Sequence, residues 1–364
     1  MMPKKVLVLG GYGNFGERIC SALAQDDCEL YIAGRSYDKA QQLAQKLRAT
    51  ACVLDHQAPE FLEQLQHIKP DILIHTSGPF QGQNYHIAAA CIKVGCHYID
   101  IADGRDYVRD ITQLNAAAQQ ANVLVVSGAS SLPALSSAVV DQYLAQFSRL
   151  DSIEHGISSG AKPPGMATME GVMSYVGKGF LRWQNQSWQT VYGWQDVVSH
   201  RYDAPVGLRF LSNCDVPDLD LFPARYPSVH SVQFRAGVGF ASTSLATWSF
   251  SWLVRLRVLK SLVPYAASLH KMATWIEPLG SEWSAMHVSL TGLNLQQQPH
   301  SITWQLLAGS NHGPNIPCFP AIALARKLLN GQIQQTGAMP CMGLLTVDEI
   351  LTAIPNLNLK WNLQ

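Results

Sequence analysis

The sequence contains few charged residues. Asp, Glu, Lys and Arg make up 14% of its 364 residues, against about 25% in an average soluble protein. The 26 basic and 26 acidic residues cancel, so the chain lacks the basic surface that nucleic acids require, and we expect no nucleic-acid partner. Hydrophobic residues make up 47%. This predicts a large buried surface in a core, a subunit interface or a membrane contact.

Several enzyme and metal-binding motifs are also missing. The eight cysteines include no C-x-x-C pair, and the sequence has no zinc, EF-hand, Walker-loop or serine-hydrolase signature. The first apolar run stops at Gly10, which is too early for the core of a secretory signal peptide. We therefore expect reduced cysteines, no bound metal ion and a cytoplasmic protein.

One long stretch lacks charge altogether, between Arg235 and Arg255. Its length approaches that of a transmembrane helix, but its many serines and threonines argue against insertion. Three interpretations remain open for the segment 236–254: a buried helix, a homodimer interface, or a helix over 240–260 that lies weakly on a membrane surface. We expect a homodimer.

The first 130 residues alternate apolar strands with helical patterns. We predict strands over 5–9, 30–33, 51–54, 72–75, 97–99 and 123–126. Between them we predict helices over 15–24, 40–48, 61–67, 85–94 and 108–121. Strands that are apolar on both faces and separated by helices indicate a parallel sheet covered by helices. Six such strands predict an α/β fold with an N-terminal doubly wound, Rossmann-type nucleotide-binding domain.

The pattern changes after Ser130. We predict a helix over 132–147, strands over 150–158 and 188–192, a hairpin over 286–309 and a helix over 321–329. The expected domains are a nucleotide-binding domain (1–131), an α+β domain for substrate and dimerisation (132–310), and a C-terminal segment (311–364) whose helix returns to the first domain.

The stretch GGYGNFGERI (10–19) follows the first buried strand and opens a helix. In a G-x-G-x-x-G loop, Gly11 allows a tight turn, Gly13 lets the backbone approach a pyrophosphate, and Gly16 lets helix and strand pack closely. The phosphates then bind the free N–H groups and the positive end of the helix. This context predicts a dinucleotide site rather than a simple turn.

The second strand ends in YIAGRS, with no carboxylate before Asp38. A site selective for NAD places Asp or Glu there, whereas the guanidinium of Arg35 and the hydroxyl of Ser36 suit the 2′-phosphate of NADP. Asp55, after the third strand, is a candidate contact of the adenine amino group or a loop cap.

The loops after the fourth and fifth strands reach the same sheet edge. In HTSGPF (75–80), Ser77 and Phe80 are expected near the nicotinamide ribose, and Asp103 follows the fifth strand. Hydride transfer needs a group that gives or takes a proton. We select Asp103 and the loop residue His312 as candidates.

The ordered motifs GGYGNFG, AGRS, HTSGPF, CIKVGCHYIDIADGRDYV and GASSLPALSS resemble the saccharopine dehydrogenase-like family of NADP-binding oxidoreductases. The resemblance implies a Rossmann domain followed by a domain built on a mixed sheet. It implies that NADP is held by three groups of residues: Gly11, Gly13, Asn14, Phe15 and Gly16; Arg35 and Ser36; and Ser77, Gly78, Pro79 and Phe80.

The resemblance implies an oxidoreductase of small molecules. The substrate stays open, as does the bond that reacts (C–N, C–O or C=C), with an amino acid or imine among the candidates. The alternative is a protein that binds NADPH without turnover, as a sensor or scaffold held at a membrane surface by the 240–260 helix.

Overall fold

The computed structural model describes residues 3–239 and 241–364 and divides into two compact units. The first unit comprises Met1–Ala138 and Pro314–Pro355, and the second comprises Val139–Gly313 and Asn356–Gln364. The C-terminal segment that we expected at 311–364 is therefore shared. Its helix belongs to the first unit, and its last strand belongs to the second.

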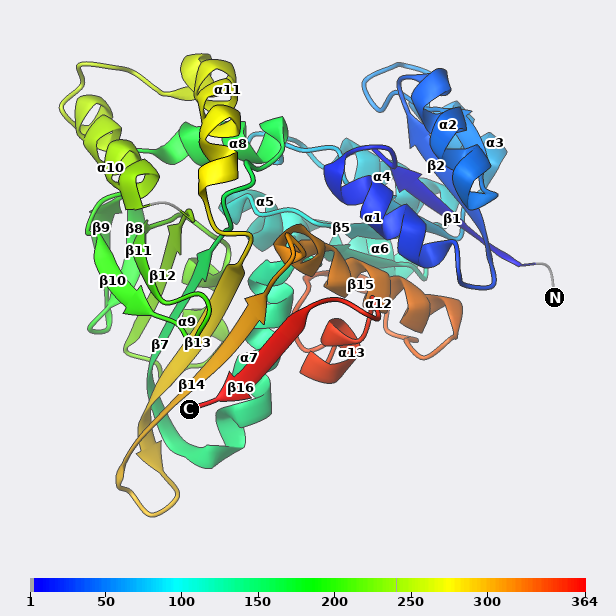
Figure 1. Ribbon diagram of the computed structural model, residues 1–364. Helices are drawn as coiled ribbons and strands as arrows, with labels where there is room; N and C mark the ends of the chain where they lie inside the picture. Colours follow the sequence, from blue (N-terminus) through cyan, green and yellow to red (C-terminus); the bar gives the residue numbers. More distant parts are fainter. Residues whose placement is uncertain (1–2, 240) are drawn as a thin grey trace. The chain divides into compact units, whose positions relative to one another are not determined.

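The first unit is built on a parallel sheet (Figure 1). The strand order is β15-β6-β5-β4-β1-β2-β3. Six of these strands have the order of a doubly wound dinucleotide-binding fold, which confirms the predicted α/β class; β15 adds a seventh strand beside β6. The bounds are β1 (Lys4–Leu9), β2 (Cys28–Gly34), β3 (Thr50–Val53), β4 (Ile72–His75), β5 (His97–Asp100), β6 (Leu124–Ser127) and β15 (Gly337–Pro340).

Helices lie between these strands in the sequence, and two further helices, α12 and α13, lie near the end of the chain. They are α1 (Asn14–Leu23), α2 (Tyr37–Leu47), α3 (Phe61–Ile68), α4 (His86–Val94), α5 (Arg105–Arg109), α6 (Asn115–Gln120), α12 (Phe319–Leu329) and α13 (Val347–Leu351). The single helix predicted over 108–121 was wrong, because a short 3₁₀ turn, Asp110–Leu114, separates α5 from α6. The Asn115 side chain, at the start of α6, accepts a hydrogen bond from the backbone N–H of Ala338 in β15 (3.0 Å).

The central strands are buried on both faces. Val6, Leu7, Val8 and Leu9 of β1 are at most 1% exposed. Because both faces of these strands carry apolar side chains, polar side chains lie mainly in the loops at the strand ends. The carboxyl ends of β1, β2, β4 and β5 thus become the place where a polar site can form.

The helix predicted over 132–147 was also too long. α7 spans Ser136–Tyr143, and a separate turn, Ser131–Leu135, precedes it. Leu132 has extended backbone angles (φ −127°, ψ 129°). Pro133 explains the break, since proline lacks an N–H and disfavours the helical conformation in the residue before it.

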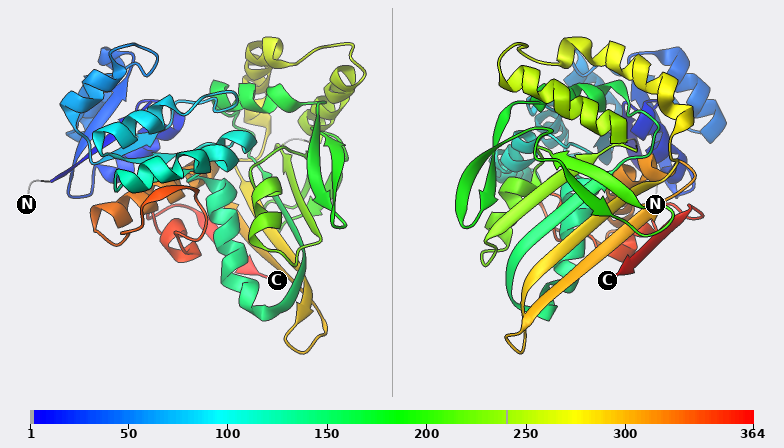
Figure 2. Two further views of the ribbon diagram at one scale, coloured as in Figure 1. Left: turned by 180° about the vertical axis from the view of Figure 1, so that it is seen from behind. Right: turned by 60° about the vertical axis from the view of Figure 1, so that its left-hand side comes forward.

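The second unit contains a mixed sheet in the order β10-β11-β12-β7-β13-β14-β16. β12 and β7 are parallel, and the other neighbouring pairs are antiparallel. In the right-hand view of Figure 2 the predicted hairpin, β13–β14, lies beside the red final strand β16. The bounds are β7 (Phe147–Ser158), β10 (Val198–Arg201), β11 (Leu208–Asn213), β12 (Ser231–Gly237), β13 (Ser284–Asn294), β14 (Pro299–Ala308) and β16 (Leu359–Leu363).

A two-stranded sheet and four helices complete this unit. The sheet is formed by β8 (Gly179–Gln184) and β9 (Ser187–Tyr192). The helices are α8 (Met166–Tyr175), α9 (Asp218–Arg225), α10 (Ala241–Arg255) and α11 (Ala266–Ile276).

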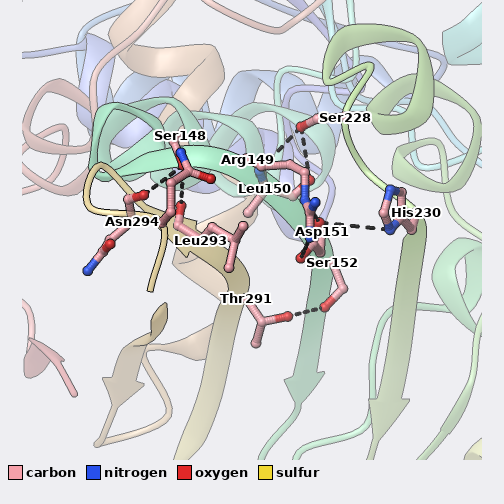
Figure 3. Close-up of polar contacts among 11 residues, drawn as sticks. Ser148, Arg149, Leu150, Asp151, Ser152, Ser228, His230, Thr291, Leu293 and Asn294 are labelled. Atoms are coloured by element: carbon pink, nitrogen blue, oxygen red, sulfur yellow. Dashed lines mark hydrogen bonds and ion pairs between the residues drawn. The ribbon is translucent and has the colours of Figure 1, made fainter. Parts of the chain in front are cut away.

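Hydroxyl groups secure the start of β7 where its register with β13 shifts. The shifts fall between Thr291 and Gly292 and between Leu293 and Asn294. As Figure 3 shows, Ser148 donates from Oγ to the carbonyl oxygens of Leu293 (3.2 Å) and Asn294 (2.6 Å). These bonds join the start of β7 to the end of β13 beside the register shifts.

Candidate active site

The glycine loop joins β1 directly to α1. Gly10 has φ +82°, in the left-handed region that favours glycine. A Cβ atom on Gly16 would lie 2.2 Å from the Gly10 carbonyl oxygen and 2.8 Å from the Gly11 Cα, so only glycine allows this approach. Gly13 precedes α1 and has no side chain to cap it. The first turn of α1 can therefore offer its N–H groups to a phosphate group.

The two residues that follow Gly13 have different surroundings. The Oδ1 atom of Asn14 accepts a hydrogen bond from Nη1 of Arg18 (2.7 Å), so its side chain is held within α1. Phe15 is half-buried, and its carbonyl oxygen accepts from the Cys318 thiol (3.7 Å). Their backbone N–H groups lie in the first turn of α1.

The end of β2 presents Arg35 to solvent. Its side chain is exposed and makes no hydrogen bond or ion pair within the part of the chain that the structure describes. Ser36 is the N-cap of α2, and its Oγ accepts a hydrogen bond from the Lys39 N–H (3.5 Å). No carboxylate lies between Gly34 and Asp38. Arg35 is thus the residue that suits a 2′-phosphate.

Tyr12 links the glycine loop to this strand end, and the sequence analysis missed it. Its hydroxyl oxygen accepts from the Ser36 N–H (3.0 Å). A Cβ atom on Gly34 would lie 2.4 Å from the Tyr12 ring, so the glycine leaves room for that ring. The contact fixes the two nucleotide-binding segments relative to each other.

The loop after β4 packs against the glycine loop. Thr76 donates from Oγ1 to the carbonyl oxygens of Leu9 (2.9 Å) and Gly10 (3.1 Å). Gln83 donates from Nε2 to the carbonyl oxygens of Ser77 (2.9 Å) and Pro79 (2.7 Å). Ser77, Gly78 and Pro79 are therefore brought to the glycine loop, as expected from the order of the strands.

Phe80 turns inward instead. It is 4% exposed, and its ring centroid lies 4.9 Å from that of His75 and 5.5 Å from that of Tyr107. The ring packs in the interior of the first unit, whereas the sequence analysis expected it beside the nicotinamide ribose.

A buried chain of hydrogen bonds supports this loop from below. His75 contacts the Tyr98 hydroxyl through Nδ1 (2.9 Å) and the Ser77 carbonyl oxygen through Nε2 (3.2 Å). The Tyr98 and Tyr107 hydroxyls are 3.1 Å apart. Burial lowers the pKa of His75 to about 3. The neutral ring therefore donates to Ser77 and accepts from Tyr98, which orients the Ser77 backbone.

Asp100 ties the ends of β5 and β6 together. Its Oδ1 atom accepts from the N–H groups of Ala102 (2.9 Å) and Gly128 (2.8 Å) and from the Ser127 hydroxyl (2.9 Å). The side chain is fully buried, and its burial raises the pKa of Asp100 to about 6.

Asp100→Asn is expected to flatten the dependence of stability on pH. Because the folded protein binds this proton more tightly than the unfolded chain does, its stabilising contribution is present below pH 4 and is lost as the pH rises through 6. The wild-type protein should lose about 2 kcal/mol relative to the variant between pH 4 and pH 7. Urea unfolding of both proteins at several pH values measures this difference. Parallel pH curves would refute the assignment.

Asp103 lies in the first unit and His312 in the second. Asp103 is exposed, and its Oδ1 accepts from Nε2 of Gln81 (3.1 Å). His312 is half-buried, and its Nδ1 accepts from the Asn358 N–H (2.9 Å), which places the proton of the neutral ring on Nε2. Asp55 accepts from the Gln57 N–H (3.0 Å) and acts as a loop cap.

Comparison with known proteins shows what the nucleotide-binding half of the chain is similar to. Residues 6–126 match the family model of the saccharopine dehydrogenase NADP binding domain. A curated relative, the trans-acting enoyl reductase of Mycobacterium ulcerans (strain Agy99), is 27% identical over 139 residues. That match covers 35% of this chain and 33% of the relative, so it spans about a third of the relative's length.

Two solved structures extend over nearly the whole chain. Apo saccharopine dehydrogenase (L-Glu forming) from Saccharomyces cerevisiae has a TM-score of 0.70 at 14% identity, covering 99% of this chain and 100% of that one. The amine dehydrogenase from Mycobacterium smegmatis has a TM-score of 0.50 at 11% identity, covering 98% and 97%. At these identities the likeness concerns the fold. The resemblance inferred from the sequence is confirmed: the chain carries, over residues 6–126, the NADP-binding domain of the saccharopine dehydrogenase family, and NADP is its cofactor.

Proposed function

We propose that this protein is an NADP-dependent oxidoreductase that transfers a hydride to or from a small molecule. One juxtaposition carries the proposal: the uncapped, glycine-lined start of α1 and the exposed Arg35 at the adjoining strand end. The first suits a pyrophosphate and the second suits a 2′-phosphate. NADPH, when bound, supplies the hydride; the protein supplies binding, orientation and proton transfer.

The residues present fit this cofactor. The backbone of Gly13, Asn14 and Phe15 would hold the pyrophosphate, and Arg35 would hold the 2′-phosphate. The Ser77–Pro79 loop, fixed by Gln83 and His75, would border the nicotinamide half. Ser36, Asp55 and Phe80 would support the site without touching NADP. Ser36 and Asp55 cap backbone N–H groups, and Phe80 packs in the interior.

We propose an amino acid or imine as the substrate, and hence reaction at a C–N bond. The names of the saccharopine dehydrogenase and the amine dehydrogenase, which share the fold over nearly the whole chain, favour this bond. The name of the enoyl reductase indicates a C=C bond, but that match covers a third of each protein. Following NADPH oxidation with panels of imines and of enoyl compounds separates the two. Turnover of enoyl compounds alone would contradict the proposed bond.

Asp103 is the proposed proton-transfer residue, with His312 as a second candidate. Asp103→Asn should lower kcat by about 100-fold, a typical loss for a missing general acid or base. Asparagine retains an acceptor for Gln81, so the Kd of NADPH should change less than about twofold. Asp106→Asn, another exposed carboxylate in the following helix, is the matched control. Equal kcat values in the two variants would exclude Asp103 from this role.

A further inference from the structure

Helix α10 buries two serines and one valine, whereas its large apolar residues Leu245, Trp248 and Phe250 are exposed. Its buried residues are Ser244, Ser251 and Val254. Ser251 accepts a hydrogen bond at Oγ from Nε2 of Gln195 (3.3 Å), which holds this side of the helix against the rest of the unit. An ordinary surface helix has the opposite arrangement, with large apolar residues toward the core. Among the described residues, the outer side of α10 thus keeps large apolar side chains exposed.

The exposed apolar surface continues through the connection into α11, and we call it the α10–α11 face. Trp248 is 36% exposed and Trp275 is 73% exposed. The face groups many exposed apolar side chains, whereas such residues ordinarily occur singly on protein surfaces. Its members are Leu245, Trp248, Phe250, Leu256, Val258, Val263, Tyr265, Met272 and Trp275.

An apolar cavity opens on this face. It has a volume of about 260 Å³ and lies between α8, α10 and α11, with Met169, Met173 and Leu269 in its lining. None of the lining residues is charged. Phe250 and Met272 both line the cavity and belong to the exposed face, so the cavity reaches the surface there. Flexible methionine side chains adapt to a hydrocarbon chain.

The segment that forms the face carries only basic charges, and the nearest acidic residues are Glu170 in α8 and Glu277 just after α11. No Asp or Glu occurs from residue 221 to residue 276, whereas Arg257, Lys260 and Lys271 are exposed. Lys271 Nζ lies 5.7 Å from the Trp275 ring centroid. Exposed aromatic and apolar side chains with cations beside them are typical of segments that lie in a membrane interface. A second copy docked through the same face would place like charges together, which disfavours self-association.

We propose that the α10–α11 face binds the surface of a bilayer containing anionic lipid. The apolar side chains would enter the interface, Arg257, Lys260 and Lys271 would face the anionic headgroups, and the cavity would accept one acyl chain. None of the helices formed by residues 3–239 and 241–364 is long and apolar enough to cross a membrane. The proposal concerns attachment to the bilayer surface and does not rest on the NADP site.

Flotation with vesicles tests this proposal. We expect the full-length protein to bind phosphatidylcholine vesicles containing phosphatidylserine at least about tenfold more strongly than pure phosphatidylcholine vesicles, because each cation near an anionic surface contributes about fivefold. The double variant Trp248→Ser/Trp275→Ser should lose at least about tenfold in binding through lost apolar contact. Arg257→Gln/Lys260→Gln should remove most of the preference for anionic vesicles.

Trp361→Ser is the matched control, since Trp361 is also exposed (48%) but lies in β16, outside the face. It should bind vesicles as the wild-type protein does. The circular dichroism spectrum and melting temperature of every variant should match those of the wild-type protein, which reports that its second unit is folded, and NADPH affinity should stay unchanged because the NADP site lies in the first unit. Absence of vesicle binding, or equal binding by the wild-type protein and the tryptophan double variant, would overturn the proposal. It would equally be overturned by a wild-type dimer that ignores vesicles and that the double variant converts to a monomer.

Discussion

A Gly13→Val variant is expected to lose at least about 100-fold in affinity for NADPH and NADH alike, which corresponds to ~2.7 kcal/mol. The residue precedes α1, where the backbone must approach the pyrophosphate that both nucleotides share. A branched side chain would stand between the helix N–H groups and the phosphates. Nucleotide titration followed by nicotinamide fluorescence measures the loss.

The fold should survive this change. A Cβ atom on Gly13 would lie 3.1 Å from the Gly10 carbonyl oxygen, a tight contact that a small shift relieves. Gly16→Ala is the contrasting control, because its Cβ would meet backbone atoms at 2.2 Å. We expect Gly16→Ala to lower the melting temperature clearly and Gly13→Val to lower it little. Normal nucleotide affinity in folded Gly13→Val protein would refute the glycine-loop assignment.

Arg35→Ala should weaken NADPH binding at least about tenfold while NADH affinity changes less than about twofold. A hydrogen bond to a charged group contributes about 1.5–3 kcal/mol, and only NADPH carries the 2′-phosphate. The Arg35 side chain is exposed and makes no hydrogen bond or ion pair with the described residues, so its removal should not disturb the fold. Calorimetric titration with each nucleotide gives the two affinities.

Lys46→Ala provides the control for loss of one positive charge. Lys46 is exposed in the last turn of the same helix, α2, away from the strand end. Its replacement should leave both affinities close to those of the wild-type protein. Equal losses of NADPH and NADH affinity in Arg35→Ala would show that Arg35 does not bind the 2′-phosphate.

The sequence predicts the nucleotide-binding half well because its backbone constraints appear as residue types. Gly16 must be glycine where helix and loop meet, and buried parallel strands must be apolar on both faces. Such local requirements can be recognised without knowing what lies elsewhere in the chain. The strand order and the cofactor class followed from them.

Contacts between distant segments could not be predicted in the same way. Tyr12 contacts Ser36, and His75 contacts Tyr98, but no spacing in the sequence indicates either pair. Phe80 was expected at the cofactor because its loop reaches the sheet edge. Packing against His75 and Tyr107 instead buries its ring in the interior of the first unit.

The uncharged stretch before Arg255 shows a different limit. Composition alone left a core, a dimer interface and a membrane contact open. The structure shows that the side of α10 carrying Ser244 and Ser251 is buried, whereas Trp248 and Phe250 are exposed. Hydrophobic content alone does not show which side of a helix is buried. That information comes from the orientation of α10 in the structure.

The central claim is that the first unit binds NADPH in preference to NADH, and direct titration of the purified protein with both nucleotides tests it. We expect micromolar affinity for NADPH and at least about tenfold weaker affinity for NADH, as the exposed guanidinium of Arg35 and the absence of a carboxylate at the end of β2 require. Equal affinities, or no binding of either nucleotide, would contradict the account.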